Sequence, residues 1–221
     1  MNKQYNYEGY IQALMKISIP RPSEAFFTKS PCVKAYLSSG LYQPVPFTAQ
    51  FPAPDRTANS FFGRTINTLD TIEHAMGLVH RATFGLKPHP TLLEAEIAKL
   101  DEEMRGDPPF ILLVKAGGGL NGFEDTIHGG VLASLFDEAL SCCAEQCRAS
   151  FSDAKTALYT ARLDVSYGAP VSSSCILIIK TWLRQRDDRK WFLDAELFTE
   201  DGKVRGTAKS LWISQKPQSG L

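Results

Sequence analysis

The clearest hydrophobic pattern lies in the second half of the chain. Residues 110–115 form a short apolar run typical of a strand, and residues 129–148 form a long stretch that is apolar on nearly every side, which indicates a buried helix. Turn signals occur at Asp187–Asp188 and Asp201–Gly202, between strand-like runs at 157–167, 175–184, 190–199 and 204–214. A strand, a long helix and a meander of four strands predict an α+β fold with an antiparallel sheet.

The first half of the chain carries different signals. Seven of the 13 prolines of the whole chain lie between residues 20 and 54, among several aromatic residues, so the sequence predicts an irregular or extended arm that packs on another surface. Two capped helices are expected next. One runs from Thr91 to Gly106. The other begins at Asp70 and carries an apolar stripe on one face: Ile72, Met76 and Val79.

These patterns divide the chain into three parts. Residues 1–106 are predicted to form an N-terminal extension made of the arm and the helices, residues 107–215 a compact α+β domain, and residues 216–221 a short C-terminal tail.

Charge and hydropathy exclude several classes of protein. With 24 basic and 24 acidic side chains the net charge is zero, so the chain lacks the basic surface of a nucleic-acid binder or a polybasic membrane anchor. No apolar run approaches about 18 residues, and the first residues resemble neither a secretory signal nor a mitochondrial presequence. We therefore expect a cytoplasmic protein without a membrane span; the mitochondrial alternative lacks a clear presequence.

The five cysteines do not predict a disulfide framework. Their number is odd, and Cys142, Cys143 and Cys147 crowd one short stretch of the expected long helix. No histidine or second cysteine cluster completes a zinc site, so no metal is expected. The simplest interpretation is that these thiols are small buried hydrophobic groups in a reducing compartment.

The long helix carries the candidate chemistry. Asp137 lies among apolar neighbours, where a carboxylate is costly unless it is paired or used. The helix begins with Gly129 and Gly130, and the first N–H groups of a helix lack partners within it and can hold an oxyanion. Eight residues at about 1.5 Å each place these features about 12 Å apart, too far for one active site. Two antiparallel copies of the helix would each supply half of a site.

Each feature also has an ordinary structural interpretation. A His-Gly-Gly sequence is commonly a tight turn at a helix start, and a single aspartate within a helix is commonly exposed or paired with a cation. Their combination on one apolar helix, before four strands, favours a functional site.

The motif His128-Gly129-Gly130, with Asp137 nine residues after the histidine, resembles the hot-dog fold thioesterases. It is similar to the phenylacetate-pathway (PaaI-type) branch and, more closely, to the animal thioesterase superfamily members 4 and 5. The similarity covers residues 108–214 approximately, including Tyr167-Gly168-Ala169-Pro170, which resembles the family's Tyr-x-x-Pro, and the last strands with Asp201-Gly202 and Ala208-Lys209-Ser210. In the first half, residues 61–65 and the segment from Asp70 resemble extensions of fungal members.

The resemblance implies a fold, an assembly and a set of site residues. The fold is a long helix wrapped by an antiparallel sheet, and the molecules are homodimers, often paired into homotetramers, with the site between subunits. Asp137 matches the general base or nucleophile, and Gly129, with Gly130 beside it, matches the N–H donor to the thioester carbonyl. His128 matches the residue that positions that carbonyl or the helix start, and Thr160 matches the one that orients the water or the carboxylate.

Three further residues are candidate substrate contacts. Asn121 lies seven positions before His128, whereas several relatives carry an asparagine at six, where this chain has Gly122. Arg184 and Arg189 flank an expected hairpin and would meet the phosphates of the substrate, although such turns are commonly charged and solvated.

The sequence therefore predicts an acyl thioesterase that hydrolyses an acyl-CoA or a carrier-protein-bound acyl thioester with water activated by Asp137. Coenzyme A or phosphopantetheine would be part of the substrate, so no resident cofactor is expected. Two alternatives stay open. One is a specialised-metabolite enzyme that uses the groove for acyl release or rearrangement, with its pocket shaped by the arm. The other is a non-catalytic acyl-binding protein, which the joint presence of His128, Gly129, Asp137 and Thr160 disfavours.

Overall fold

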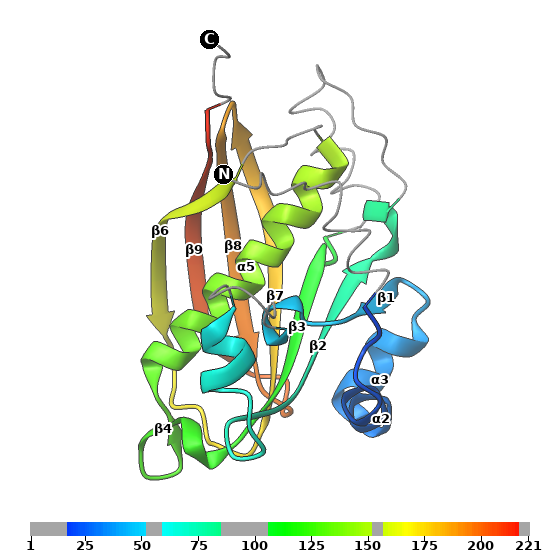
Figure 1. Cartoon of the computed structure of the whole chain (residues 1–221), viewed down its shortest axis with the longest axis vertical. Helices are drawn as coiled ribbons and strands as arrows, with labels where there is room; N and C mark the ends of the chain where they lie inside the picture. The colour runs from blue at the N-terminus through cyan, green and yellow to red at the C-terminus, as the bar shows by residue number, and fades with distance from the viewer. Residues whose placement is uncertain (1–16, 52–58, 85–105, 152–156, 217–221) are drawn as a thin grey trace.

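A long helix lying on an antiparallel sheet is the centre of the computed structural model, which describes residues 17–51, 59–84, 106–151 and 157–216 (Figure 1). The helix is α5 (Gly129–Phe151). The strands are β1 (Tyr42–Val45), β2 (Ile72–His80), β3 (Phe110–Ala116), β6 (Leu158–Tyr167), β7 (Ile176–Asp187), β8 (Lys190–Phe198) and β9 (Val204–Ser214). They pair antiparallel in the order β1-β2-β3-β7-β8-β9-β6. This architecture confirms the predicted α+β hot-dog fold.

The remaining elements are short. Two helices, α2 (Arg21–Lys29) and α3 (Pro31–Ser38), precede the sheet, and a two-stranded ribbon of β4 (Asn121–Phe123) and β5 (Thr126–Ile127) leads into α5. Four helical turns connect these elements: η1 (Thr48–Gln50), η2 (Phe61–Thr65), η3 (Arg81–Phe84) and η4 (Gly118–Leu120). None of the helices within the described ranges is long and apolar enough to cross a membrane.

One face of the sheet packs against α5. The helix buries Leu135, Phe136 and Leu140 in this main core, and the three clustered cysteines of the helix are buried with them, as predicted. Phe47 and Phe62 of the N-terminal half join the same cluster. These two residues of the N-terminal half are therefore part of the main core.

The other face of the sheet packs against α2 and α3. Phe27 and Val33 of these helices are fully buried against Met76, Leu78 and Ile111 of the sheet. The strands β2, β3 and β7 are consequently covered on both faces, which explains why β3 is an almost unbroken apolar run. The N-terminal part is helical and irregular, as expected, but it also contributes β1 and β2 to the sheet. The division at residue 106 stays a prediction.

The helix predicted from Asp70 is wrong, because residues 72–80 form strand β2. The apparent helical stripe arose from a strand that is buried on both faces: Ile72 and Val79 face the α5 side, whereas Met76 faces α2. A Cβ atom at position 77 would lie only 2.8 Å from Val45 Cγ2. The glycine at this position therefore allows β1 to pack closely. Instead of capping a helix, Asp70 accepts a hydrogen bond from the Gly119 N–H through its backbone carbonyl.

Two other expectations need correction. The described part of the arm, residues 20–51, is largely helical, because Pro22 and Pro31 lie in the first turns of α2 and α3, where a missing N–H costs nothing. Its aromatic residues do pack, as predicted. The last four strands are not a simple meander, since β6 pairs with β9 and β7 pairs with β3. The helix predicted from Thr91 lies outside the described residues.

If α2 is an integral layer, truncating its buried anchor should destabilise the whole molecule. We expect Phe27→Ala to lower the free energy of unfolding by about 3–5 kcal/mol, through lost burial and a cavity. Denaturant unfolding measures this change, with Lys29→Ala, an exposed position of the same helix, as the control. A Phe27→Ala protein as stable as the control would show that α2 does not belong to the cooperative unit.

Candidate active site

The start of α5 is built around the side chain of His128. The His128 carbonyl accepts hydrogen bonds from the N–H groups of Val131 and Leu132, which begins the helix. Its Nδ1 accepts a hydrogen bond of 2.9 Å from the Gly130 N–H. An Nδ1 that accepts this bond carries no proton, so the ring N–H lies on Nε2. The sequence placed both glycine N–H groups at the candidate oxyanion site, but that of Gly130 is already engaged.

Gly129 keeps its N–H available. None of the described residues accepts a hydrogen bond from it. This group lies at the positive end of a 23-residue helix, where a developing negative charge is stabilised. Of the two glycine N–H groups predicted to hold an oxyanion, only that of Gly129 lacks an acceptor among the described residues.

Two glycines enclose the His128 ring. A Cβ atom on Gly122 would be 2.8 Å from His128 Cδ2, and one on Gly130 would be 3.0 Å from Nδ1. An asparagine at position 122 would therefore collide with the histidine. Asn121 itself is exposed on β4, opposite Ile127, and contacts neither His128 nor Gly129 through any hydrogen bond between described residues. Its role in binding substrate stays a prediction.

Tyr167 is a site residue that the sequence indicated only as part of a motif. Its hydroxyl donates a hydrogen bond of 2.9 Å to the Gly129 carbonyl, and its ring lies 3.3 Å from the position of a Cβ atom on that glycine. The side chain is 54% exposed. Tyr167 thus fixes the first peptide of α5 from the edge strand β6 and leaves part of its ring open to solvent.

The second group of predicted residues meets on the same side of the sheet. Thr160, on β6, donates a hydrogen bond of 3.0 Å to Asp137 Oδ1 on α5. Burial raises the pKa of Asp137 above its ordinary value of 3.8, and the Thr160 hydrogen bond opposes this rise. Asp137 is partly exposed, so it combines a more basic carboxylate with access from the edge of the sheet.

The next residue, Glu138, shares the same low-dielectric surroundings. Burial, together with the nearby charge of Asp137, raises its pKa to about 7. Within the described ranges it has no hydrogen-bond partner, whereas Asp137 is oriented by Thr160. The sequence indicated only Asp137 as a candidate base. The structure adds Glu138 as a second carboxylate with a raised pKa.

The candidate residues thus form two separate groups in one chain. One contains His128, Gly129 and Tyr167 at the helix start, and the other contains Asp137 and Thr160. The eight-residue interval along α5 separates them by about 12 Å, so they cannot act on the same bond within one copy.

The two candidate arginines lie at the other end of the sheet. Arg184 forms an ion pair with Asp194, and Arg189 donates a hydrogen bond to the Ser214 carbonyl, both near the hairpin that joins β7 to β8. The helix start lies at the opposite end of β7. At that end the Ala116 N–H of β3 donates a hydrogen bond to the carbonyl of Cys175, the residue before β7. Within one chain the structure does not bring these arginines to the candidate site, and their contact with phosphates stays a prediction.

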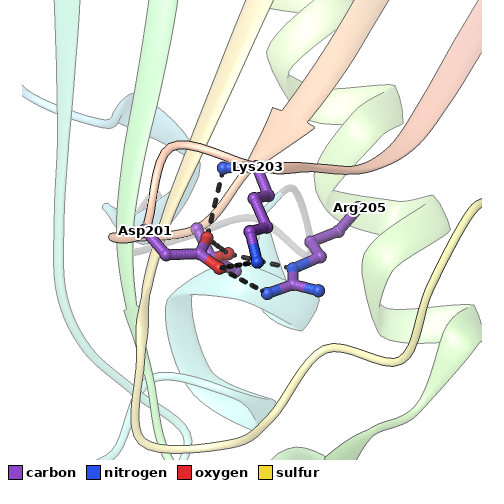
Figure 2. Close-up of polar contacts among 4 residues, drawn as sticks. Asp201, Lys203 and Arg205 are labelled. Carbon is purple, nitrogen blue, oxygen red and sulfur yellow. Dashed lines mark hydrogen bonds and ion pairs between the residues drawn. The ribbon is translucent and has the colours of Figure 1, made fainter.

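A hollow of about 270 Å³ lies at the same end of the sheet as the helix start. Its lining includes Pro170 of the Tyr-x-x-Pro turn and Arg205. Figure 2 shows the carboxylate of Asp201 facing Arg205 and Lys203; the Arg205 Nη2 lies 2.7 Å from it. A hydrogen bond from Thr199, and one from the Lys203 N–H, hold the pKa of Asp201 below its usual value. The positive charge of Arg205 is therefore balanced, and the hollow offers polar groups without a strong net charge.

No group of three or more His, Cys, Asp or Glu side chains in the described part of the chain is arranged to hold a metal ion. The chemistry of the candidate site is that of a carboxylate, an imidazole, two hydroxyls and a backbone N–H.

One long helix on a seven-stranded antiparallel sheet, with a His-Gly-Gly helix start, defines a hot-dog domain. Residues 124–205 match the family model described as "Thioesterase superfamily". The acyl-coenzyme A thioesterase THEM4 of Rattus norvegicus is 25% identical over 118 residues, covering 53% of this chain and 48% of the relative. The protein of the same name from Bos taurus is 28% identical over 109 residues, covering 49% of this chain and 42% of the relative.

Solved structures overlap with the chain over a similar length. The PaaI protein from the phenylacetic acid degradation operon of E. coli has 14% identity and a TM-score of 0.43, covering 48% of this chain and 72% of its own. The BH2602 protein of Bacillus halodurans, solved with CoA, has 16% identity and a TM-score of 0.43. The match covers 48% of this chain and 66% of the BH2602 chain. The fold assignment rests on the sheet order and the family match, and these scores do not add to it.

Within this hot-dog domain, residues 124–205 are therefore similar to the thioesterase superfamily. The chain spans about half the length of the curated relatives it matches.

The hydrogen bond from Thr160 can be tested by titration. Because that bond lowers the pKa of Asp137, Thr160→Val should raise this pKa further and shift the carboxyl titration to higher pH. NMR titration of ¹³C-labelled aspartate carboxyl groups measures the shift, with the exposed Thr207→Val on β9 as the control. An Asp137 titration that is identical in Thr160→Val and in the control would refute the interaction.

Proposed function

We propose that the protein is an acyl thioesterase that hydrolyses a thioester of coenzyme A or of a carrier-protein phosphopantetheine. The observation that carries the proposal is the pair of half-sites on α5. A helix-start N–H without an acceptor among the described residues suits an oxyanion, and a carboxylate with a raised pKa suits a general base. The naming of two mammalian relatives as acyl-coenzyme A thioesterases supports coenzyme A as the thiol.

The reaction follows from the chemistry of these groups. A water molecule attacks the carbonyl carbon of the thioester while Asp137 accepts its proton. The carbonyl oxygen becomes an oxyanion that receives the Gly129 N–H, an interaction worth about 3–4 kcal/mol in the transition state. Collapse of the tetrahedral intermediate breaks the carbon–sulfur bond, and the thiolate leaves as the free thiol after taking up a proton. The products are a carboxylic acid and a thiol, and no resident cofactor takes part.

Two copies of the chain are required for this reaction. Asp137 of one copy must act on a carbonyl held by Gly129 of the partner subunit, because about 12 Å separate these residues in one chain. The proposed assembly is a homodimer, alone or paired into a tetramer, with its sites between subunits. Thr160 holds the base in one subunit, while His128 and Tyr167 fix the helix start in the other.

Replacing the proposed base tests the mechanism directly. Asp137→Asn should lower kcat for acyl-CoA hydrolysis by about 10²–10⁴-fold, because an amide cannot accept the proton from water. Release of free thiol from acyl-CoAs of several chain lengths measures the effect. Asp188→Asn, at an exposed turn with a φ of 48° that asparagine adopts readily, is the matched control and should retain wild-type activity.

The neighbouring carboxylate makes this test specific. Glu138→Gln should reduce activity far less than Asp137→Asn, since Glu138 lacks the Thr160 hydrogen bond that orients the base. The opposite order of effects would transfer the role of base to Glu138. If the wild-type protein binds acyl-CoAs but releases no thiol from any of them, the non-catalytic acyl-binding alternative would replace the proposal.

A further inference from the structure

A turn at residues 68–71, directly before β2, contacts the loop that leads to the helix start, at the lower end of the sheet in Figure 1. Two threonines close this turn. The Thr68 N–H donates a hydrogen bond of 3.0 Å to Thr71 Oγ1, and the Thr71 N–H donates one of 3.2 Å to the Thr68 carbonyl. The carbonyls of Asp70 and Thr71 take no part in this closure, so they are available to another segment.

Those two carbonyls hold the glycine-rich loop that precedes β4. The Gly117 N–H donates a hydrogen bond of 2.7 Å to the Thr71 carbonyl. The Gly119 N–H donates one of 2.7 Å to the Asp70 carbonyl. A Cβ atom on Gly117 would lie 2.7 Å from the Asp70 carbonyl carbon, and one on Gly119 would lie 2.7 Å from Asp70 Oδ2. On Gly118, between them, a Cβ atom would meet nothing closer than 3.8 Å. Close approach of the turn therefore requires glycine at two of the three positions.

The loop connects the turn to the helix start. Leu120, which follows the glycines, is buried in the main core, and its carbonyl accepts a hydrogen bond of 2.8 Å from the His128 N–H. His128 in turn accepts the Gly130 N–H through Nδ1 and leaves that of Gly129 without an acceptor among the described residues. One series of short contacts thus leads from the turn to the proposed oxyanion donor.

We infer that the turn at residues 68–71 positions the Gly129 N–H for catalysis, with Thr71 as its main positioning residue. The inference rests on the thioesterase function proposed above and adds a segment of the N-terminal half to the site. The residues that match the family model begin at 124, so the turn and the glycine-rich loop both precede them. An oxyanion donor must be fixed before the reaction, and a displacement of about 1 Å can cost about 10²-fold in rate.

A positioning role differs measurably from a general contribution to stability. The Gly129 N–H acts on charge that develops in the transition state, so a displaced helix start should lower kcat and leave KM almost unchanged. Partial unfolding lowers the amount of active enzyme instead, and kcat per folded molecule stays the same. A displaced helix start should also alter the hydrogen bond between the Gly130 N–H and His128 Nδ1, which ¹⁵N NMR detects directly.

Two adjacent glycines offer a matched pair of variants in the full-length chain. Gly117→Ala forces a methyl group against the Asp70 carbonyl, so it should lower kcat for acyl-CoA hydrolysis by about tenfold or more and shift the NMR signals of the Gly130 amide and the His128 ring. Gly118→Ala has space for its methyl group and should keep the wild-type kcat and signals. Thiol release per folded molecule, with the folded fraction from circular dichroism, measures kcat.

A second pair of variants keeps the test decisive if Gly117→Ala does not fold. Thr71→Val removes the hydroxyl that accepts the Thr68 N–H, and the looser turn should lower kcat by about two- to tenfold. Thr71→Ser retains the hydroxyl and should restore the wild-type kcat and the His128 signals.

The outcomes separate this inference from the proposed function. Folded Gly117→Ala and Thr71→Val proteins with wild-type kcat and unchanged His128 signals would overturn the inference, and so would a loss of stability that leaves kcat per folded molecule unchanged. If the wild-type protein releases no thiol, the proposed hydrolysis fails and the NMR signals alone decide. Signals that shift in Gly117→Ala but not in Gly118→Ala would support positioning of the helix start by the turn, and signals that shift in neither variant would refute it.

Discussion

A helix fixes the distance between the residues that it carries. Gly129 and Asp137 lie on the same rigid element, and burial of Leu135, Phe136 and Leu140 against the sheet prevents α5 from bending to bring them together. The helix start and the carboxylate are therefore held at a fixed separation of about 12 Å. The proposed function depends on that separation, because the candidate groups of a single copy lie too far apart to act on the same bond.

The packing of α5 also determines which groups stay available. Its apolar side faces the sheet, so Asp137 emerges towards β6, where Thr160 orients it. At the helix start, the His128 side chain occupies the Gly130 N–H and leaves that of Gly129 without a described acceptor. Tyr167 fixes the Gly129 peptide from the same edge strand. Strand β6 thus contacts both groups of candidate residues.

Much of this could be predicted from the sequence, and the failures share a physical cause. The long helix, β3 and the last four strands were predicted because α5 is apolar nearly all round and the strands are bounded by turn residues such as Asp188 and Gly202. Strand β2 was mistaken for a helix because both of its faces are buried, so its apolar residues do not alternate. Periodicity reports burial on one face, and it cannot reveal that α2 covers the other.

The residues of the candidate site and their separation along the helix could be predicted, but the contacts around them could not. The motif identified His128, Gly129, Asp137 and Thr160, but no spacing could show that the Gly130 N–H is already occupied or that Tyr167 contacts Gly129. The arginines at the β7–β8 hairpin were selected by charge alone, and their distance from the helix start depends on strand length and direction.

Subunit complementation tests the two-copy site most directly. Asp137→Asn removes the base, and Gly129→Pro removes the donor N–H at the first helical position, which proline tolerates. Each variant alone should be inactive. When the two are coexpressed, half of the dimers are mixed and each mixed dimer contains one intact site, so the account predicts about one quarter of wild-type thioesterase activity. Mixed dimers that are as inactive as their parents would contradict a site shared between subunits.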